Sequence, residues 1–360
     1  MAQTREIEIL RAESIAVAGT RTINLDITEP VSRLDVIWRK TNTNRTPIAH
    51  PGAIVPSIEL IDGSDVLSQM NGRSAQALAY FHTGLIPGSK PSYEIGSWSI
   101  QCASIYFGRY MFDEMLAVDP KRFTNLQLRI THNLALGGST GTVADLSVYA
   151  HVFDEKVVQP VGFLQSKEIY SFLPVANAWV YIDIPADHDI KAILLTAPGC
   201  TDSPEWNLAN IRITEAEGRR VLVESAMERY LYQCAARDPV YMEHIEYRPA
   251  ATTSFAFYAA PHWERSFVGH ACGSTVAVQY TQENGETYHT LMATAPDVIE
   301  GWAMGHCPFG SIYIPFGEKG SVEGAWDIRK AGNGRLAIQA GATPVVAVPV
   351  RVFLQQVRRY

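Results

Sequence analysis

The sequence predicts an all-β protein built from two consecutive β-sandwich domains, each with one short helix. Three observations lead to this prediction. The chain is longer than a single hydrophobic core usually supports, and it carries a long-period duplication. Many short strand-like runs are also separated by clusters of Gly, Pro, Asn and Asp. Of its 360 residues 47% are hydrophobic and 19% are charged, a composition that can bury two cores.

Two stretches carry the duplication, because each reads as a strand, a polar turn, a second short strand and a helix. IELIDGSDVLSQM at 58–70 and IRITEAEGRRVLV at 211–223 both open with alternating apolar positions, the period of a half-buried strand. The residues at helical spacing that follow are Ala75, Leu78, Ala79 and His82 in the first copy and Met227, Tyr230, Leu231 and Cys234 in the second. We expect the first helix to stop at Gly84 and the second at Asp238 and Pro239.

The ends of the two halves also correspond. The first half ends with the strand-like runs IYFGRY, LQLRITHN and ADLSVYAHVF. The second half ends with three corresponding runs, IYIPFG, RLAIQAG and VVAVPVRVF. The stretch LALGGSTGT at 134–142 is predicted to be a hairpin, because a strand-like run follows it and no Lys completes a phosphate-binding loop. The clearest two-residue hairpin is predicted at Asn284 and Gly285.

These patterns divide the chain into an N-terminal arm at 1–19, a first sandwich at 20–160 and a second sandwich at 161–360. The second half is longer than the first between its helix and its closing strands, so we place a surface loop insertion at about 240–306. Apart from the two helices of the duplication, only short helical pieces such as MFDEMLAVD at 111–119 are expected.

Charge and cysteine content narrow the function classes. The net charge is −7 and the longest basic runs are pairs, whereas a protein that grips a nucleic-acid backbone over a broad face needs a basic patch. The absence of a long apolar run gives no reason to expect a membrane-spanning segment. The five cysteines occur singly and favour buried reduced thiols over a disulfide framework. They are Cys102, Cys200, Cys234, Cys272 and Cys307.

Histidines and acidic residues offer two kinds of candidate site. The pairs His270 with Cys272 and His306 with Cys307 contain metal-ligand types, but they lack the tight, repeated spacing of zinc sites, so we expect no metal. Carboxylate pairs for sugar hydrolysis could come from Asp183, Asp187 and Asp189, or from Asp113 with Glu114. Asp-rich solvated turns are common, so the expectation is no catalytic residue and no cofactor.

Three tryptophans in polar surroundings of the second half could stack on sugars or on a partner subunit. They are Trp206, Trp263 and Trp302. A loop anchor is the simpler interpretation of each one.

A duplicated β-sandwich with a helix in each copy and a long second-half insertion resembles the double jelly-roll major capsid proteins of the tectivirus, corticovirus and adenovirus lineage. Within that lineage it resembles those of the tailless, lipid-containing icosahedral bacteriophages. The stretches that carry the resemblance are IELIDGSDVLSQMNGRSAQALAYF, IRITEAEGRRVLVESAMERYLY and, near the C-terminus, IYIPFGEKGSVEGAWDIRKAGNGRLAIQA.

The resemblance implies two upright jelly rolls in one chain and a homotrimeric, pseudo-hexagonal capsomer of a virion shell, made in the host cytoplasm. It implies neighbouring capsomers and penton or minor capsid proteins as partners, with no sequence-specific nucleic acid. The 240–306 insertion would form a tower on the outside, and the chain ends MAQTREIEILR and QQVRRY would lie inside, where basic residues can meet an internal membrane.

Two alternatives stay open from the sequence. The first is a jelly-roll hydrolase acting on glycans or glycopeptides through the Asp-rich loops. The second is a carbohydrate-binding surface protein that uses the loop tryptophans.

Overall fold

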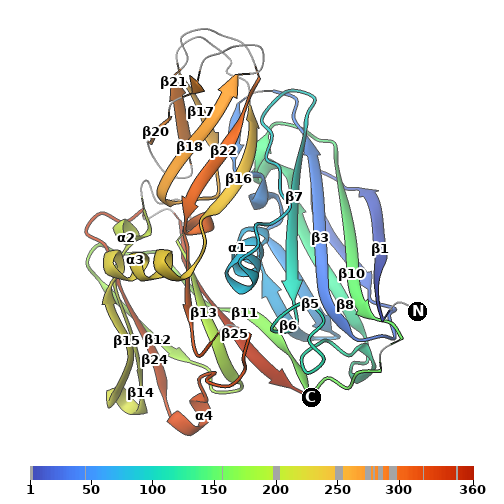
Figure 1. Ribbon diagram of the computed structural model, residues 1–360, viewed down its shortest axis with the longest axis vertical. Helices are drawn as coiled ribbons and strands as arrows, with labels where there is room; N and C mark the ends of the chain where they lie inside the picture. Colours follow the sequence, from blue (N-terminus) through green and yellow to red (C-terminus); the bar gives the residue numbers. More distant parts are fainter. Residues whose placement is uncertain are drawn as a thin grey trace.

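Two β-sandwich lobes stand side by side in the computed structural model, with a smaller β module above them (Figure 1). The structure describes residues 3–44, 46–155, 157–197, 203–247, 254–271, 277–278, 280–282, 287–291, 298–318, 320–345 and 348–360. We call the strands from β1 to β10 with helix α1 the first lobe. Strands β11–β15 and β23–β25 with helices α2–α4 are the second lobe, and strands β16–β22 are the tower.

The first lobe consists of two facing antiparallel sheets of four strands each. One sheet has the order β1 (Thr4–Ser14), β10 (Ala144–Phe153), β3 (Val31–Thr41) and β7 (Trp98–Tyr106). The other has the order β2 (Ala18–Asn24), β8 (Leu126–Asn133), β5 (Ser57–Asp62) and β6 (Asp65–Met70). Helix α1 (Gly72–Thr83) follows β6, and two short strands, β4 (Pro47–Ala49) and β9 (Gly138–Ser139), pair with each other.

The second lobe repeats this topology strand for strand. Its first sheet has the order β11 (Gly162–Phe172), β25 (Val350–Arg359), β13 (Asp189–Thr196) and β23 (Ser311–Pro315). Its second has the order β12 (Trp179–Ile184), β24 (Gly334–Ala340), β14 (Leu208–Glu215) and β15 (Arg220–Ala226). Helix α3 (Met227–Arg237) follows β15 as α1 follows β6, and the single-turn helices α2 (Pro204–Asn207) and α4 (Ile328–Ala331) flank the lobe.

The tower lies between α3 and β23 in the sequence, within the range of about 240–306 expected for an insertion. One sheet contains β16 (Tyr241–Tyr247), β22 (Ile299–His306), β18 (Trp263–Ala271) and β19 (Ala277–Val278). The other contains β17 (Ser254–Tyr258), β21 (Thr287–Leu291) and β20 (Tyr280–Gln282). Strands β20 and β21 pair antiparallel as predicted, while the predicted turn at Asn284 and Gly285 lies outside the described residues.

The duplicated strand, turn, strand and helix are confirmed in both lobes. The Asn71 side chain accepts a hydrogen bond from the Ser74 backbone N–H at 2.8 Å and so caps α1, and Gly84 ends the helix with a φ of 74°. Asp238 ends α3, and the second helix buries the four residues whose spacing predicted it.

Three predictions of local structure are wrong. Residues 4–14 are not an arm but strand β1, which pairs with β10. Residues 111–119 form no helix: turns and bends at 111–115 lead into isolated β-bridges at Leu116 and Val118, and the Asp113 carboxylate accepts hydrogen bonds from the backbone N–H groups of Arg109 and Met115. Residues 134–142 do not form a hairpin, because β8 and β10 belong to opposite sheets and the stretch crosses between them.

That crossing is held by a buried lysine. The Lys40 ammonium, on β3, donates to the carbonyl oxygens of Leu134, Gly137 and Ser139 at 2.7, 2.8 and 2.5 Å. Lys40 is 1% exposed, so these three carbonyls take the place of water around the charge.

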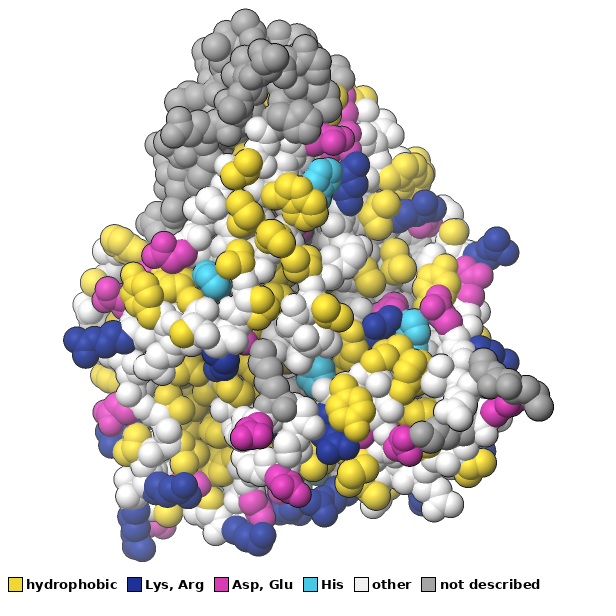
Figure 2. Space-filling model, viewed as in Figure 1, with side chains coloured by type: hydrophobic (Ala, Val, Ile, Leu, Met, Phe, Trp, Pro, Cys, Tyr) yellow, Lys and Arg dark blue, Asp and Glu magenta, His cyan; other side chains and the backbone are white. Residues whose placement is uncertain are grey.

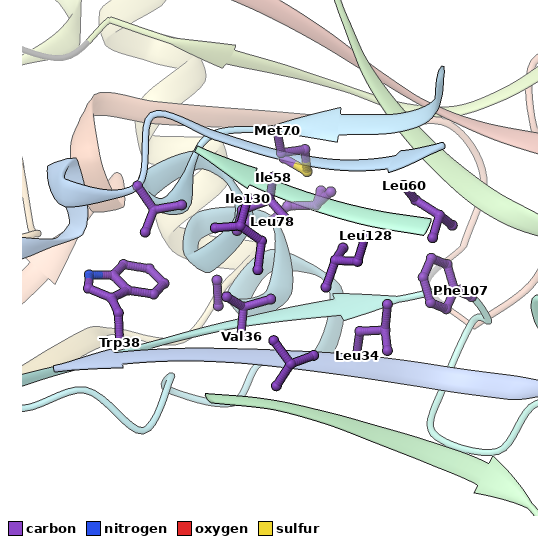
Figure 3. Close-up of a cluster of buried hydrophobic side chains, with 14 of the residues drawn as sticks. Leu34, Val36, Trp38, Ile58, Leu60, Met70, Leu78, Phe107, Leu128 and Ile130 are labelled. Carbon is purple, nitrogen blue, oxygen red and sulfur yellow. The ribbon is translucent and has the colours of Figure 1, made fainter. Parts of the chain in front are cut away.

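The core of the first lobe is formed where its two sheets face each other (Figure 3). Leu34, Val36 and Trp38 point inward from β3 and meet Leu128 and Ile130 from β8, and side chains of β5, β6 and α1 complete the cluster (Figure 3). A separate cluster fills the second lobe. Each lobe therefore has its own hydrophobic core, as expected for a domain of this size.

Candidate assembly surfaces

The contact between the two lobes buries helix α1 against the outer face of the sheet that contains β23. The rings of Phe81 on α1 and Tyr313 on β23 are stacked, with centroids 5.4 Å apart. Tyr80 lies edge-on to Tyr241 on the tower strand β16 at 5.1 Å, and its hydroxyl donates to the carbonyl of Pro239, just before that strand. Nine of the twelve residues of α1 are buried, so this helix is covered by the second lobe and by the base of the tower as well as by its own lobe.

The second-lobe sheet β11-β25-β13-β23 is apolar on both faces because it lies between the cores of the two lobes. On β13, Ile193 and Leu195 join the second-lobe core, while Ala192 and Leu194 join the first-lobe cluster from the opposite face. Phe353 on β25 also joins the first-lobe cluster. A strand buried on both faces has a continuous apolar run in its sequence, as β13 does in its segment AILL.

The corresponding face of the first-lobe sheet is polar. Arg33 and Asp35 on β3 form an ion pair at 2.7 Å, and the Nε2 atom of His151 on β10 lies 2.7 Å from the Asp35 carboxylate. Burial raises the pKa of Asp35, but hydrogen bonds from His151 and Ser104 and the charge of Arg33 outweigh burial and hold it below its usual range. This face carries charges where its counterpart carries Leu194 and Phe353.

One side of helix α3 is exposed, whereas helix α1 is covered. The buried residues of α3 are Met227, Tyr230, Leu231 and Cys234, all on one side of the helix. Tyr232, on the opposite side, is 58% exposed. Hydrophobic side chains lie on this face of the molecule beside α3, along the seam between the lobes and on the tower (Figure 2).

A buried histidine and glutamate join the tower to the first lobe. The Nδ1 atom of His50 accepts a hydrogen bond from the Gly52 backbone N–H at 3.0 Å, so Nε2 carries the proton and donates to Glu243 on β16 at 3.0 Å. The second carboxylate oxygen of Glu243 accepts from the Ala260 N–H at 2.9 Å. Both side chains are almost fully buried, so the pair fixes the tower on the lobe.

The acidic candidates for hydrolysis do not form a carboxylate pair in any contact of the structure. Asp183 forms an ion pair with Arg335 at 2.9 Å, and Asp189 pairs with Arg329 at 2.7 Å and Arg359 at 3.4 Å. Asp187 lies in the exposed turn between β12 and β13. Asp113 is buried against Arg109, while its neighbour Glu114 is exposed.

The histidine and cysteine candidates are not brought together as a metal site. No group of three His, Cys, Asp or Glu side chains able to hold a metal occurs among the described residues. Burial lowers the pKa of His306, and Cys307 beside it is buried. The side chain of His270 and all of Cys272 and Cys200 lie outside the described part.

Burial raises the pKa of the Cys102 thiol to about 12 and that of Cys234 to about 11, so both are protonated at neutral pH.

The three candidate tryptophans occupy different places. Trp263 is buried between Tyr232 of α3 and His306, with ring centroids 4.9 and 5.7 Å away. Trp206 is exposed on α2, and Trp302 is exposed on β22 beside His244. No sequence pattern predicted the contacts that Tyr80 and Phe81 of α1 make outside the first lobe, although the uninterrupted apolar run of β13 was a signal for a sheet covered on both faces.

No family model matches this chain, and no curated protein matches it in sequence. Solved structures match it over almost its whole length. The major capsid protein P2 of bacteriophage PM2 is 11% identical, with a TM-score of 0.53 over 99% of this chain and 98% of P2. VP54 of PBCV-1 is 9% identical, with a TM-score of 0.56 over 98% of this chain and 93% of VP54. The STIV MCP is 11% identical, with a TM-score of 0.50 over 97% of each chain.

These likenesses, together with the repeated strand order, identify the fold as the double jelly roll. The all-β fold class and the tandem jelly rolls predicted from the sequence are thereby confirmed. In the described part of the chain no helix has both the length and the apolar character needed to cross a membrane.

Proposed function

We propose that this chain is the major capsid protein of an icosahedral virus and that three copies form a capsomer of nearly hexagonal outline. The observation that carries the proposal is the identical strand order of two lobes standing side by side. Three chains with two similar lobes each present six similar faces, which suits positions of near-sixfold symmetry in a shell. The fold shared with the PM2 capsid protein supports the same role.

The tower and the chain ends give the proposed capsomer an orientation. The C-terminus lies at the end of the molecule opposite the tower, and the N-terminus is also away from it (Figure 1). Lys and Arg side chains occur along this lower end (Figure 2). We place the tower outside the virion and the lower end inside, where basic side chains can meet an internal membrane or minor capsid proteins.

The proposed role is structural and requires no catalytic residue, cofactor or metal. Its partners are other copies of the chain, neighbouring capsomers and penton or minor capsid proteins. The hydrolase and carbohydrate-binding alternatives have less support, because Asp183 and Asp189 are engaged in ion pairs and Trp263 is buried.

Light scattering on the purified chain tests the proposal. We expect a compact trimer of a 39.8 kDa chain at neutral pH, since obligate interfaces of this kind bury about 2,000–5,000 Å². A stable monomer that persists at high protein concentration would contradict the proposal.

A further inference from the structure

A pocket lies between the two lobes beside the first turn of helix α1. Its volume is about 300 Å³, which is at the lower end of the range of small-molecule sites. The first lobe supplies the segment around Val55 and the start of α1, and the second lobe supplies Thr196 at the end of β13 and Arg351 near the start of β25. A molecule bound in this pocket would therefore contact both lobes.

A buried hydroxyl in this pocket has no hydrogen-bond partner. Thr196 lines the pocket and is 3% exposed, yet its Oγ1 atom makes no hydrogen bond within the described part of the chain. Buried polar groups in native proteins nearly always have a partner, because an unsatisfied one costs free energy. The Thr196 hydroxyl is therefore placed to donate to an acceptor atom of a ligand.

Two arginines give the polar side of the pocket a positive charge. Arg351 lies directly opposite Thr196 in the pairing of β25 with β13, so both side chains point to the same face of the sheet. Arg73, the second residue of α1, lines the pocket from the first lobe. The Nη1 atom of Arg351 forms an ion pair with Glu168 at 3.1 Å, but the guanidinium retains further N–H donors. No acidic residue occurs among the described residues that line the pocket, so an anionic acceptor is favoured.

The start of α1 is held in place by bonds within the first lobe. The Gly72 N–H donates to the Val55 carbonyl at 2.8 Å, and the Ser74 N–H donates to the Asn71 side chain at 2.8 Å. These bonds fix the pocket wall from the first lobe. They also direct the positive end of the dipole of a twelve-residue helix toward the pocket, which adds to the attraction for an anion.

Most of the remaining lining is hydrocarbon. The apolar residues are Val55, Pro56, Leu136, Phe309, Val348 and Pro349. Proline has no N–H group, so these walls offer few partners for the backbone amides of a bound peptide. An alkyl chain needs only apolar contact and therefore suits them better.

We propose that this pocket binds an aliphatic monocarboxylate of the medium-chain fatty acid class. Its carboxylate accepts hydrogen bonds from Thr196 and Arg351 and faces Arg73, and its alkyl chain packs against Leu136 and Phe309. At ~30 Å³ for each water-sized group, about ten non-hydrogen atoms fill the volume, which is the size of octanoate. The inference concerns the single chain and does not rest on the proposed capsomer.

Isothermal titration calorimetry of the full chain with sodium octanoate at pH 7 tests the proposal. We expect one site per chain with a Kd of about 10–500 µM. Hexanoate should bind at least about tenfold more weakly, because each buried methylene group changes the Kd about fourfold. Titrations at two temperatures detect binding even where its enthalpy is zero at one of them, because burial of apolar surface changes the heat capacity.

Thr196→Val removes the hydroxyl and keeps the shape of the side chain. We expect it to raise the Kd for octanoate at least about tenfold, since a hydrogen bond to a carboxylate is lost. Urea unfolding of the ligand-free variant should show no loss of stability, because Oγ1 has no partner to lose in the described structure. Thr22→Val, at an exposed position of β2, is the matched control and should leave the Kd within about twofold of wild type.

Arg351→Met separates the charge from the apolar contacts. We expect it to raise the Kd for octanoate at least about tenfold and to leave the Kd for octan-1-ol, which has no charge, within about twofold. Equal losses for both ligands would contradict the assigned place of the carboxylate.

Three results would overturn the proposal. The first is no binding of octanoate up to about 5 mM at either temperature. The second is a Thr196→Val chain that binds octanoate as tightly as the Thr22→Val control. The third is a short peptide with an apolar C-terminal residue that binds at least about tenfold more tightly than octanoate, which would assign the pocket to a polypeptide. Octanoate binding to a chain that forms no trimer would support this inference and contradict the proposed function.

Discussion

Replacing Glu243 with glutamine should destabilise the protein although the two side chains have the same shape. The Glu243 carboxylate accepts two hydrogen bonds, one from His50 Nε2 and one from the Ala260 N–H. The Gly52 N–H fixes the proton of His50 on Nε2. A glutamine offers only one acceptor oxygen, so either rotation of its amide places two donors against each other.

The magnitude follows from one buried hydrogen bond that cannot form. Leaving a buried polar group unsatisfied costs about 1–3 kcal/mol, and the charged acceptor adds to the loss. We therefore expect Glu243→Gln to lower the free energy of unfolding by about 2–3 kcal/mol. Urea unfolding at fixed protein concentration and pH 7 measures the change, because subunit association makes the midpoint concentration-dependent.

Glu224→Gln is the matched control. Its carboxylate is 62% exposed and lies 3.8 Å from Arg212, so the same chemical change should cost less than about 0.5 kcal/mol. If Glu243→Gln is as stable as this control, the assigned proton position and the role of the pair in holding the tower are wrong.

Three further substitutions probe the interlobe contact, the crossing between sheets and the polar face. Phe81→Ala removes the ring stacked on Tyr313 and should cost about 3–5 kcal/mol in urea unfolding. Lys40→Met leaves three buried carbonyls without their donor and should cost about 1–3 kcal/mol in the same assay, because removing the buried charge, whose desolvation lowers the pKa of Lys40 to about 8, offsets part of the loss. Asp35→Asn should lower stability at pH 7 but not at strongly acidic pH, because the lowered native pKa of Asp35 stabilises the folded state only while the carboxylate is ionised.

For each of the three substitutions, one result would contradict the expected effect. A loss below about 1 kcal/mol for Phe81→Ala would mean that the lobes do not depend on this contact. A neutral Lys40→Met would show that water, and not the ammonium, satisfies the loop carbonyls. For Asp35, the stability difference from wild type should shrink as the pH falls below about 4, and a difference that stays constant would contradict the ion-pair argument.

Local patterns predicted the repeated unit because local forces specify it. Alternation at 58–62 and 211–215, and helical spacing from Ala75 to His82, each report which side of one element is buried. The stop at Gly84 follows from backbone geometry alone. These features can therefore be predicted from the local sequence, without knowing which other element packs against them.

The errors occurred where a distant partner decides the outcome. Alternation in β8 and β10 does not reveal that they lie in opposite sheets, and the Lys40 contacts that hold the crossing come from β3. The first residues read as an arm because β1 is an edge strand with mostly exposed side chains. The pairing of His50 with Glu243 joins residues 193 positions apart, which no local pattern records.

Images of single purified particles show whether two equivalent upright lobes per chain associate in threes. We expect a hexagonal outline in top views, with six lobes around a centre and three towers on one side. Particles with two lobes, or closed rings that contain any number of chains other than three, would contradict it.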